Sequence, residues 1–266
     1  MAKWTTKTCE VNGIDVHYLR TGGDKPAIVL LHGLMLNGRC WAPLARALEE
    51  DYDVIMPDAR GHGNSSAPEE GYCYNNLAVE VMGLCEALGL TSPVLLGHSM
   101  GGMTAAVVAS QNPKHLRGLI LVDPAFLTAQ RQREVNKSDV ASQHRHTLNL
   151  SKDEFLAESR IRHSRRSSEL IELFVQARFQ TSIHAFEILK SPNPDYVQLI
   201  NNLHIPSLLV VGDVDAIVSP EMIRELVEIN QRLKVAKIAE AGHAVCYDQP
   251  EIFSVIVKKF LRSLSN

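Results

Sequence analysis

Residues 93–111 read PVLLGHSMGGMTAAVVASQ and decide the fold. A short apolar run, 94–96, leads into GHSMG at 97–101, and a segment rich in Ala, Val and Met follows at helical spacing. The pattern predicts a strand, a sharp turn with Ser99 at its apex, and a helix. Glycines two residues before and after Ser99 remove side chains that would collide with neighbouring backbone on so strained a turn. The turn therefore presents the Ser99 hydroxyl outside the sheet.

Strand and helix patterns alternate on both sides of this stretch. Asn12-Gly13 lies between two alternating segments and predicts an antiparallel hairpin. The continuous apolar run at 27–31 predicts a strand that is covered on both faces. Buried strands are also predicted at 54–56 and 116–122, and further strands at 207–211 and 234–239. Apolar residues at helical spacing predict helices at 41–49, 75–88, 220–230 and 252–264. Together these elements predict an α/β fold with a doubly wound, mostly parallel sheet.

The alternation stops in the middle of the chain. Segments 153–162, 168–179 and 181–190 carry apolar residues three and four positions apart, and no strand pattern separates them. We therefore predict a core domain of residues 1–123 and 205–266, with a helical cap inserted at 124–204.

Composition narrows the class of partner. The 266 residues are 45% hydrophobic and 21% charged, and the net charge of -3 provides no basic field for nucleic acid or anionic membrane. No apolar leader or membrane-length run is present. The five cysteines form no metal-like grouping, so we expect mostly buried free thiols in a cytoplasmic protein. A small-molecule partner is expected, and the oligomeric state is left open.

GHSMGG after a buried strand resembles the nucleophile elbow of the α/β-hydrolase superfamily. DARGHGNSS at 58–66 is similar to that family's D-x-R-G-x-G-x-S loop, and His32-Gly33-Leu34 is similar to its oxyanion loop. The resemblance covers the predicted core but not the cap. It implies the α/β-hydrolase fold, a serine nucleophile, an oxyanion hole made by the backbone N–H groups of Leu34 and Met100, and no cofactor or metal.

A serine nucleophile needs a base, and the base needs an acid that orients it. Functional groups of a parallel sheet gather at the carboxyl ends of its strands, which selects Ser99, His243 and the aspartates of the sequence Gly-Asp-Val-Asp at 212–215. The latter resembles the family's acid loop, whose second aspartate orients the histidine. The predicted triad is therefore Ser99, Asp215 and His243. Asp123 is the alternative acid, because some family members carry it after that earlier strand.

The resemblance makes carboxylic esters or lactones with apolar groups the expected substrates, including acyl-homoserine lactones. Family dehalogenases and epoxide hydrolases have an aspartate where this chain has Ser99. The candidate pocket residues are apolar: Met35, Phe126, Phe155, Phe179 and Phe186. Two alternatives stay open, a carbon-carbon bond hydrolase of ring-cleavage products and a receptor that retains the triad. Cap arginines, which either bind a substrate carboxylate or form a solvated face, are Arg160, Arg162, Arg165 and Arg166.

Overall fold

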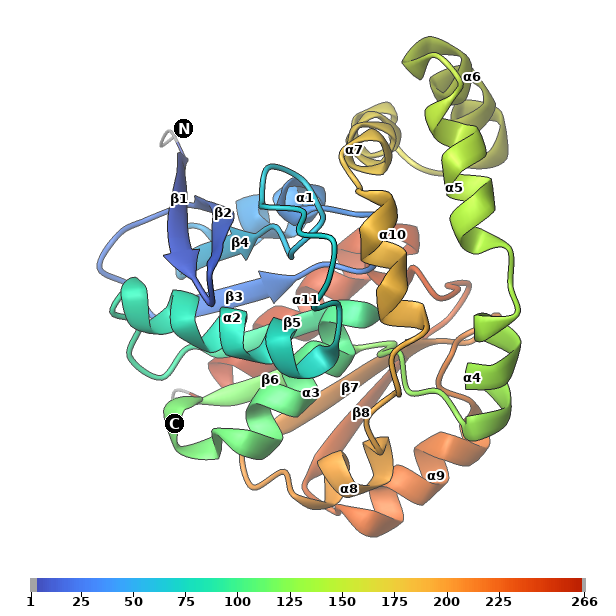
Figure 1. Cartoon of the computed structure of the whole chain (residues 1–266). Coiled ribbons are helices and arrows are strands. Elements are labelled where there is room, and N and C mark those ends of the chain that lie inside the picture. The colour runs from blue at the N-terminus through green and yellow to red at the C-terminus, as the bar shows by residue number, and fades with distance from the viewer. Residues whose placement is uncertain (1–3, 265–266) are drawn as a thin grey trace.

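A computed structural model describes residues 4–264, in which strands and helices alternate from an initial hairpin to a final helix (Figure 1). The strands are β1 (Thr5–Val11), β2 (Ile14–Arg20), β3 (Ala27–Leu31), β4 (Asp53–Pro57), β5 (Val94–His98), β6 (Gly118–Val122), β7 (Ser207–Gly212) and β8 (Leu233–Ile238). The α-helices are α1 (Ala42–Leu48), α2 (Tyr74–Ala87), α3 (Met100–Gln111), α4 (Ala129–Asn136), α5 (Val140–Leu148), α6 (Lys152–Arg162), α7 (Ser168–Phe179), α8 (Tyr196–Asn201), α9 (Pro220–Ile229), α10 (Val245–Asp248) and α11 (Pro250–Arg262). Short 3-10 helices are η1 (Gly38–Trp41), η2 (Pro113–His115) and η3 (Ile183–Leu189).

The first two strands form the predicted hairpin. β1 and β2 pair antiparallel, and the turn residues Asn12 and Gly13 have φ of 52° and 72°. These are the left-handed conformations that Asn-Gly favours in two-residue hairpin turns. β2 also pairs antiparallel with β4, so the hairpin extends one edge of the sheet.

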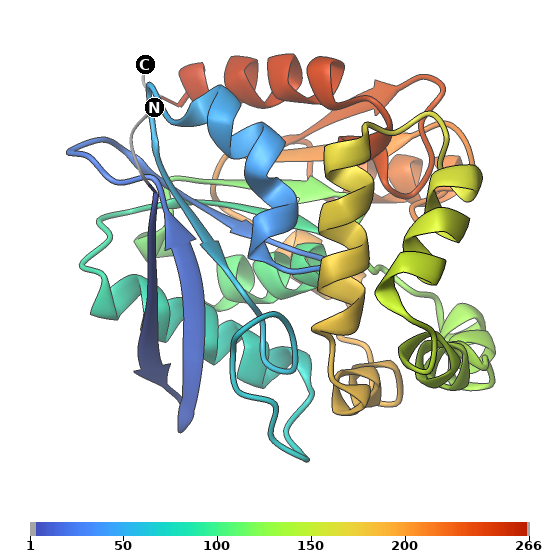
Figure 2. The same ribbon diagram turned by 90° about the horizontal axis from the view of Figure 1, so that it is seen from above.

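The sheet has eight strands in the order β1-β2-β4-β3-β5-β6-β7-β8. Neighbouring strands from β4 to β8 are parallel. Five of these strands, β3 to β7, are buried along their whole length, as their continuous apolar runs predict. Figure 2 shows α1 and α11 on one face of the sheet and α2 and α3 on the other. The predicted doubly wound α/β architecture is confirmed.

Side chains of successive strand residues enter two separate apolar cores. In β3, Val29 and Leu31 pack on the side of α2 and α3, whereas Ile28 and Leu30 pack on the side of α1 and α11. This alternation is the two-residue period of a strand that is covered on both faces. A shift of one residue would exchange the two sets, so burial fixes the register and with it the point where each loop leaves the sheet.

The parallel direction of β5 to β8 brings the loops that follow these strands to one edge of the sheet. Ser99 follows β5, Asp123 follows β6, and the loop with His243 follows β8. The fold therefore collects side chains that are up to 144 positions apart in the chain.

The segment between β6 and β7 is helical, as predicted, and α4 to α7 lie beyond the carboxyl ends of the strands (Figure 1). The boundaries expected for α7 agree with the structure, whereas the predicted segment 181–190 forms the 3-10 helix η3. The last helix of this segment, α8, does not lie with α4 to α7 but beside α9. There Asn230 Nδ2, at the end of α9, donates to Ile200 O of α8 over 2.9 Å. We refer to residues 124–204 as the cap segment, and its standing as a separate domain stays a prediction.

The cysteines and the lengths of the helices bear on two further expectations from the sequence. Cys40, Cys85 and Cys246 are buried free thiols, and Cys9 and Cys73 are half-buried free thiols. Within residues 4–264, no helix combines the length and the apolar character that a membrane crossing requires.

Candidate active site

Ser99 occupies the turn between β5 and α3. Its φ of 54° and ψ of -117° are a strained conformation for a residue with a side chain. A Cβ at Gly97 would lie 2.1 Å from Gly101 O, and a Cβ at Gly101 would lie 2.3 Å from Leu31 O. Glycine is therefore required at both positions, because any other side chain would force the strand and helix apart. The turn has the geometry that the GHSMG sequence predicts.

His243 joins Ser99 to an aspartate. His243 Nε2 lies 3.0 Å from Ser99 Oγ, and His243 Nδ1 lies 2.5 Å from Asp123 Oδ2. Asp123 is fully buried, and its two carboxylate oxygens also accept hydrogen bonds from the backbone N–H groups of Ile217 and Val218, over 2.9 Å and 3.0 Å. Because the carboxylate accepts from Nδ1–H, Nε2 is left free to accept the Ser99 proton.

The structure corrects the predicted partner of His243, which is Asp123 and not Asp215. Both aspartates follow a strand with positive φ, 35° at Asp123 and 48° at Asp215. Asp215 is exposed, whereas Asp123 lies in hydrogen-bond contact with the imidazole. The loop that follows β7 supplies backbone N–H groups to the Asp123 carboxylate instead of supplying the acid. The alternative acid of the sequence analysis is therefore the one in contact.

His98, next to the serine, supports the His243 loop. Its Nε2 donates to His243 O over 3.0 Å, and its ring centroid lies 4.8 Å from that of His243. Nδ1 is buried with no hydrogen-bond partner within residues 4–264. Burial, followed by the nearby His243 charge, lowers the pKa of His98 to about 3, so the ring stays neutral with its proton on Nε2. In this arrangement His98 supports the backbone of the His243 loop and does not contact Ser99 Oγ by a hydrogen bond within residues 4–264.

Two other buried histidines hold the loop that carries Leu34 and Met35. His32 Nδ1 donates to Gly33 O over 2.8 Å, and His62 Nε2 accepts from Met35 N–H over 3.3 Å. Met35 has a φ of 68°, so the chain turns sharply here. Burial, followed by the charge of His32, lowers the pKa of His62 to about 3, which keeps Nε2 available as an acceptor. The loop geometry therefore depends on neutral imidazoles.

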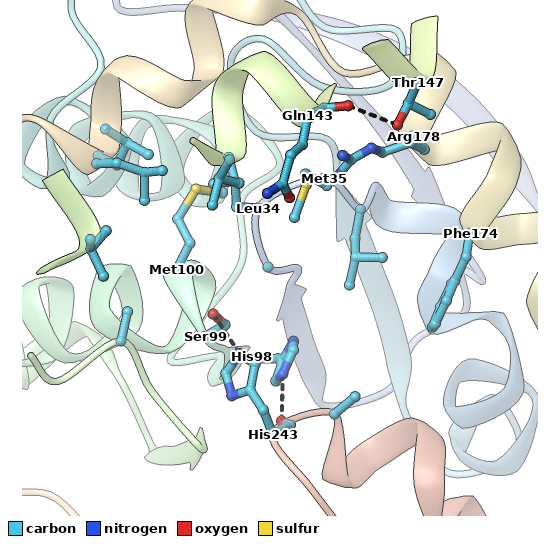
Figure 3. Close-up of a pocket in the computed structure, with 18 of the residues that line it drawn as sticks. Leu34, Met35, His98, Ser99, Met100, Gln143, Thr147, Phe174, Arg178 and His243 are labelled. Atoms are coloured by element: carbon cyan, nitrogen blue, oxygen red, sulfur yellow. Dashed lines mark hydrogen bonds between the residues drawn. The ribbon is translucent and has the colours of Figure 1, made fainter. Parts of the chain in front are cut away.

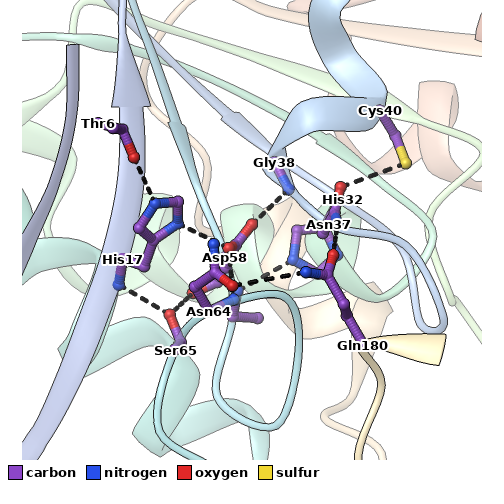
Figure 4. A network of polar contacts seen from close by, with 11 residues as sticks. Thr6, His17, His32, Asn37, Gly38, Cys40, Asp58, Asn64, Ser65 and Gln180 are labelled. Carbon is purple, nitrogen blue, oxygen red and sulfur yellow. Dashed lines mark hydrogen bonds and ion pairs between the residues drawn. The ribbon is translucent and has the colours of Figure 1, made fainter. Parts of the chain in front are cut away.

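A polar network behind this loop connects it to the hairpin and to the cap segment (Figure 4). Asp58 accepts from Gly38 N–H over 2.7 Å and from Asn64 N–H over 2.9 Å, and it forms an ion pair with His17 at 2.8 Å. Burial alone would raise the pKa of Asp58, but these hydrogen bonds outweigh it and lower the pKa. Asn37 Nδ2 donates to Gln180 Oε1 of the cap segment over 2.9 Å. The network anchors both ends of the loop.

The N–H groups of Leu34 and Met100 have no acceptor in the part of the chain that the structure describes. Met100 is the first residue of α3, where backbone N–H groups lack intrahelical partners and the helix dipole favours negative charge. Both residues line the same cavity as Ser99. Their role as an oxyanion hole stays a prediction.

A cavity of about 1080 Å³ separates the sheet edge from the cap segment and is open to Ser99 and His243 (Figure 3). Of the predicted pocket residues, Met35 and Phe155 line it. Phe126 and Phe186 do not, because Phe126 stacks on Tyr196 and Phe186 stacks on His144, and both are buried. Phe179 does not line it either, since its ring packs edge-on against Phe155 with 6.0 Å between centroids. Three of the four phenylalanines predicted to line the pocket from the cap segment therefore pack within that segment and do not line the cavity.

The cavity wall contains polar residues that the sequence analysis did not select, among them Gln143, Thr147 and Arg178. Arg178 lies on α7 four positions after Phe174 and seven after Ile171, both of which also line the cavity. An arginine on the apolar face of an amphipathic helix is the signal that could have identified it.

The four cap arginines selected from the sequence differ in whether they form ion pairs and whether they line the cavity. Arg160 pairs with Glu172 at 2.9 Å, and Arg166 pairs with Asp248 at 2.7 Å. Arg162 is exposed and lines the cavity, whereas Arg165 is exposed and lies outside it. Within residues 4–264 no group of three or more His, Cys, Asp or Glu is placed to hold a metal ion.

Comparison with known proteins identifies the family. A family model described as the alpha/beta hydrolase fold matches residues 26–250, so this chain belongs to the α/β hydrolase fold family. N-formylmaleamate deformylase from Pseudomonas putida is 30% identical over 253 residues, which cover 94% of each chain.

Solved structures agree with the fold. The crystal structure of E-2-(acetamidomethylene)succinate hydrolase superposes with a TM-score of 0.85 at 22% identity, covering 98% of this chain and 100% of that chain. A thermophilic esterase from Thermogutta terrifontis, with malate bound, superposes with a TM-score of 0.79 at 27% identity and covers 100% of both chains. The likeness at 22% identity shows the fold alone.

Proposed function

We propose that this protein is a serine hydrolase that cleaves a carboxylic acyl bond of a small molecule through an acyl-enzyme. The observation that supports it is the continuous run of hydrogen bonds from Asp123 through His243 to Ser99, at the floor of a cavity of about 1080 Å³. A neutral serine hydroxyl reacts slowly, and this run supplies the base and its orienting carboxylate.

The reaction has two halves. Ser99 Oγ attacks the acyl carbon while its proton moves to His243 Nε2, and Asp123 stabilises the imidazolium at Nδ1. The N–H groups of Leu34 and Met100 donate hydrogen bonds to the carbonyl oxygen and stabilise the negative charge that develops on it. His243 then gives its proton to the leaving group. Water, deprotonated by the same imidazole, attacks the acyl-enzyme, and His243 returns that proton to Ser99 Oγ as the bond from Oγ to the acyl carbon breaks and the acid leaves.

Esters and lactones are the first substrate class, because an alkoxide leaving group needs only the proton that His243 carries. Acyl-homoserine lactones remain within this class. Amides form a second candidate class, since a protein named N-formylmaleamate deformylase is 30% identical over 94% of the chain. Cleavage of a C–N bond uses the same residues, but His243 must protonate a nitrogen.

The test is a substrate panel with purified protein: p-nitrophenyl esters of increasing acyl length, acyl-homoserine lactones, and N-formyl and N-acetyl amides. We expect multiple turnover of at least one class. Ser99→Ala should lower kcat by about 10⁴-fold or more. Ser142→Ala is the matched control, because Ser142 is an exposed serine that lines the same cavity. Mass spectrometry of a slow ester should detect the acyl group on Ser99.

Four results would each change the proposal in a different way. Unchanged turnover in Ser99→Ala would remove Ser99 as the nucleophile. A single acylation with the fragment retained would favour the receptor alternative over an enzyme. Turnover of ring-cleavage products alone would favour carbon-carbon bond hydrolysis. Failure on every lactone, with ester turnover intact, would remove only the lactonase form.

A further inference from the structure

Arg178 is a half-buried cation in the wall of the cavity without a carboxylate partner. Its Nε is buried and has no hydrogen-bond partner within residues 4–264. Three other buried or half-buried arginines are paired: Arg20 with Asp53 at 2.6 Å, Arg60 with Glu80, and Arg166 with Asp248 at 2.7 Å. Arg117 also has unpartnered nitrogen atoms, but it precedes β6 at the far end of the sheet and does not line the cavity. The Arg178 guanidinium is therefore available to an anionic group of a ligand in the cavity.

Burial of this guanidinium is unfavourable by itself. Desolvation lowers the pKa of Arg178, although an arginine side chain stays charged at neutral pH. A charge that is removed from water and left unpaired destabilises the protein, so a partner supplied by a ligand would compensate for that desolvation. Two carboxylates also line the cavity, Asp139 and Glu158, but both are exposed to solvent, and Arg178 Nε has no partner among the described residues 4–264.

Gln143 supplies a second polar side chain on the side of the cavity from which Arg178 projects. The Gln143 side chain extends from α5 and the Arg178 side chain from α7, and both project into the cavity from the side opposite Ser99 and His243 (Figure 3). Within residues 4–264 the only side-chain hydrogen bond that reaches Gln143 goes to its backbone carbonyl, from Thr147 Oγ1 over 3.0 Å, so its side-chain amide is not engaged by another described residue. The apolar side chains of Met35 and Phe174 line the wall nearby. A planar guanidinium with one amide N–H₂ suits the two oxygens of a single carboxylate.

We propose that the substrate carries a free carboxylate, which binds to Arg178 with the Gln143 amide as a second donor, while the bond to be cleaved lies at Ser99. This inference rests on the proposed hydrolase function and names its substrate class: short monoacyl derivatives of dicarboxylic acids, or amides that bear a carboxylate. It differs from the apolar substrates that the sequence predicts. The apolar residues along the wall would contact the carbon chain between the two ends.

The activity test compares two esters of matched length, p-nitrophenyl hydrogen glutarate and the neutral p-nitrophenyl pentanoate. Wild type should prefer the anionic ester in kcat/KM. Arg178→Leu should lower kcat/KM for the anionic ester by about 10- to 100-fold and leave the neutral ester unchanged, since a hydrogen-bonded charge is lost only for the former. Arg178→Lys should restore part of the preference. Arg165→Leu is the matched control, because Arg165 is exposed and lies outside the cavity.

A binding test separates this inference from the proposed function. Glutarate should raise the melting temperature of Ser99→Ala, and the rise should vanish when Arg178→Leu is added. Arg178-dependent glutarate binding without any hydrolysis would contradict the hydrolase proposal alone. Hydrolysis with equal kcat/KM for both esters, or a glutarate effect that survives Arg178→Leu, would overturn the carboxylate site. Stabilisation by inorganic phosphate but not by glutarate would also overturn it, in favour of a phosphoryl group.

Discussion

The two walls of the cavity are built differently. On the sheet side, Ser99 N–H donates to Val122 O over 3.1 Å, and Asp123 N–H donates to Val210 O over 2.9 Å, so neighbouring strands hold both residues by their backbone. On the cap side, Arg178 and Gln143 extend from helices that lie beyond the sheet, and Arg178 Nε has no partner within residues 4–264. On the sheet side, Asp123, His243 and Ser99 are joined by hydrogen bonds to one another, whereas the cap side leaves a charge unpaired within residues 4–264. The first wall is suited to fix a reaction type, and the second to select a substrate.

The largest expected effect tests the sheet side. Asp123→Asn should lower kcat by about 10⁴-fold, because an amide in place of the carboxylate favours the wrong imidazole tautomer, as in serine proteases. Steady-state kinetics on the best substrate of the panel measures the change. Asp215→Asn is the matched control and should leave kcat unchanged, since Asp215 is exposed. The reverse pattern would restore Asp215 as the orienting acid.

A second comparison separates core packing from the cavity wall within the cap segment. Phe126 is 1% exposed and stacks on Tyr196, with 5.3 Å between ring centroids. Phe126→Ala should lower the free energy of unfolding by about 3–5 kcal/mol through the cavity it leaves. Phe155→Ala should cost less stability and change KM, because Phe155 is half-buried and lines the cavity. Urea unfolding and kinetics measure both, and equal stability losses would argue against this distinction.

The third prediction concerns pH and the buried histidines of the sheet side. Burial lowers the pKa of His62 and of His98 from 6.5 to about 3, and it also lowers the pKa of His32. Between pH 6.5 and 3 the unfolded chain binds more protons at His62 and His98 than the folded chain does. The stability contributed by these two residues should therefore be full above pH 6.5 and fall as the pH decreases, by about 1.4 kcal/mol per pH unit for each of the two.

Urea unfolding at pH 7, 6 and 5 measures this slope. His98→Gln should reduce it, because glutamine cannot take up the proton. His115→Gln is a suitable control, since His115 is exposed. A slope that does not change in His98→Gln would mean that this imidazole does not contribute to the acid sensitivity.

The smallest expected effect lies where the two regions meet on the surface. Arg46 of α1 and Glu169 of α7 form an ion pair at 2.8 Å, with side chains that are 41% and 57% exposed. Arg46→Ala should change the free energy of unfolding by less than about 1 kcal/mol, because solvent screens the pair. Thermal melts in low and high salt measure it. A larger loss would indicate that this pair, and not apolar packing, attaches the cap segment to the core.

Most strands and helices of the sheet were predictable because their residues carry periodic patterns. The continuous apolar run at 27–31 and the Asn12-Gly13 turn coincide with β3 and the first hairpin. The segment at 181–190 was expected to be a regular α-helix, yet it forms a 3-10 helix after Ser182, whose side chain accepts from His184 N–H. Local capping and packing decide between an α-helix and a 3-10 helix here, and the spacing of apolar residues does not distinguish the two.

The sequence by itself determined the position of the serine, because the strain of the turn demands glycines at 97 and 101 and leaves a local signature. It also located His243 in a loop after the last strand. Only the tertiary structure decided which aspartate meets His243, since Asp123 and Asp215 both follow strands and both have positive φ. It also decided that Arg178 faces the cavity while Phe126 and Phe186 pack inside. Contacts between distant segments depend on how elements pack in space, and a pattern read along one segment contains no such information.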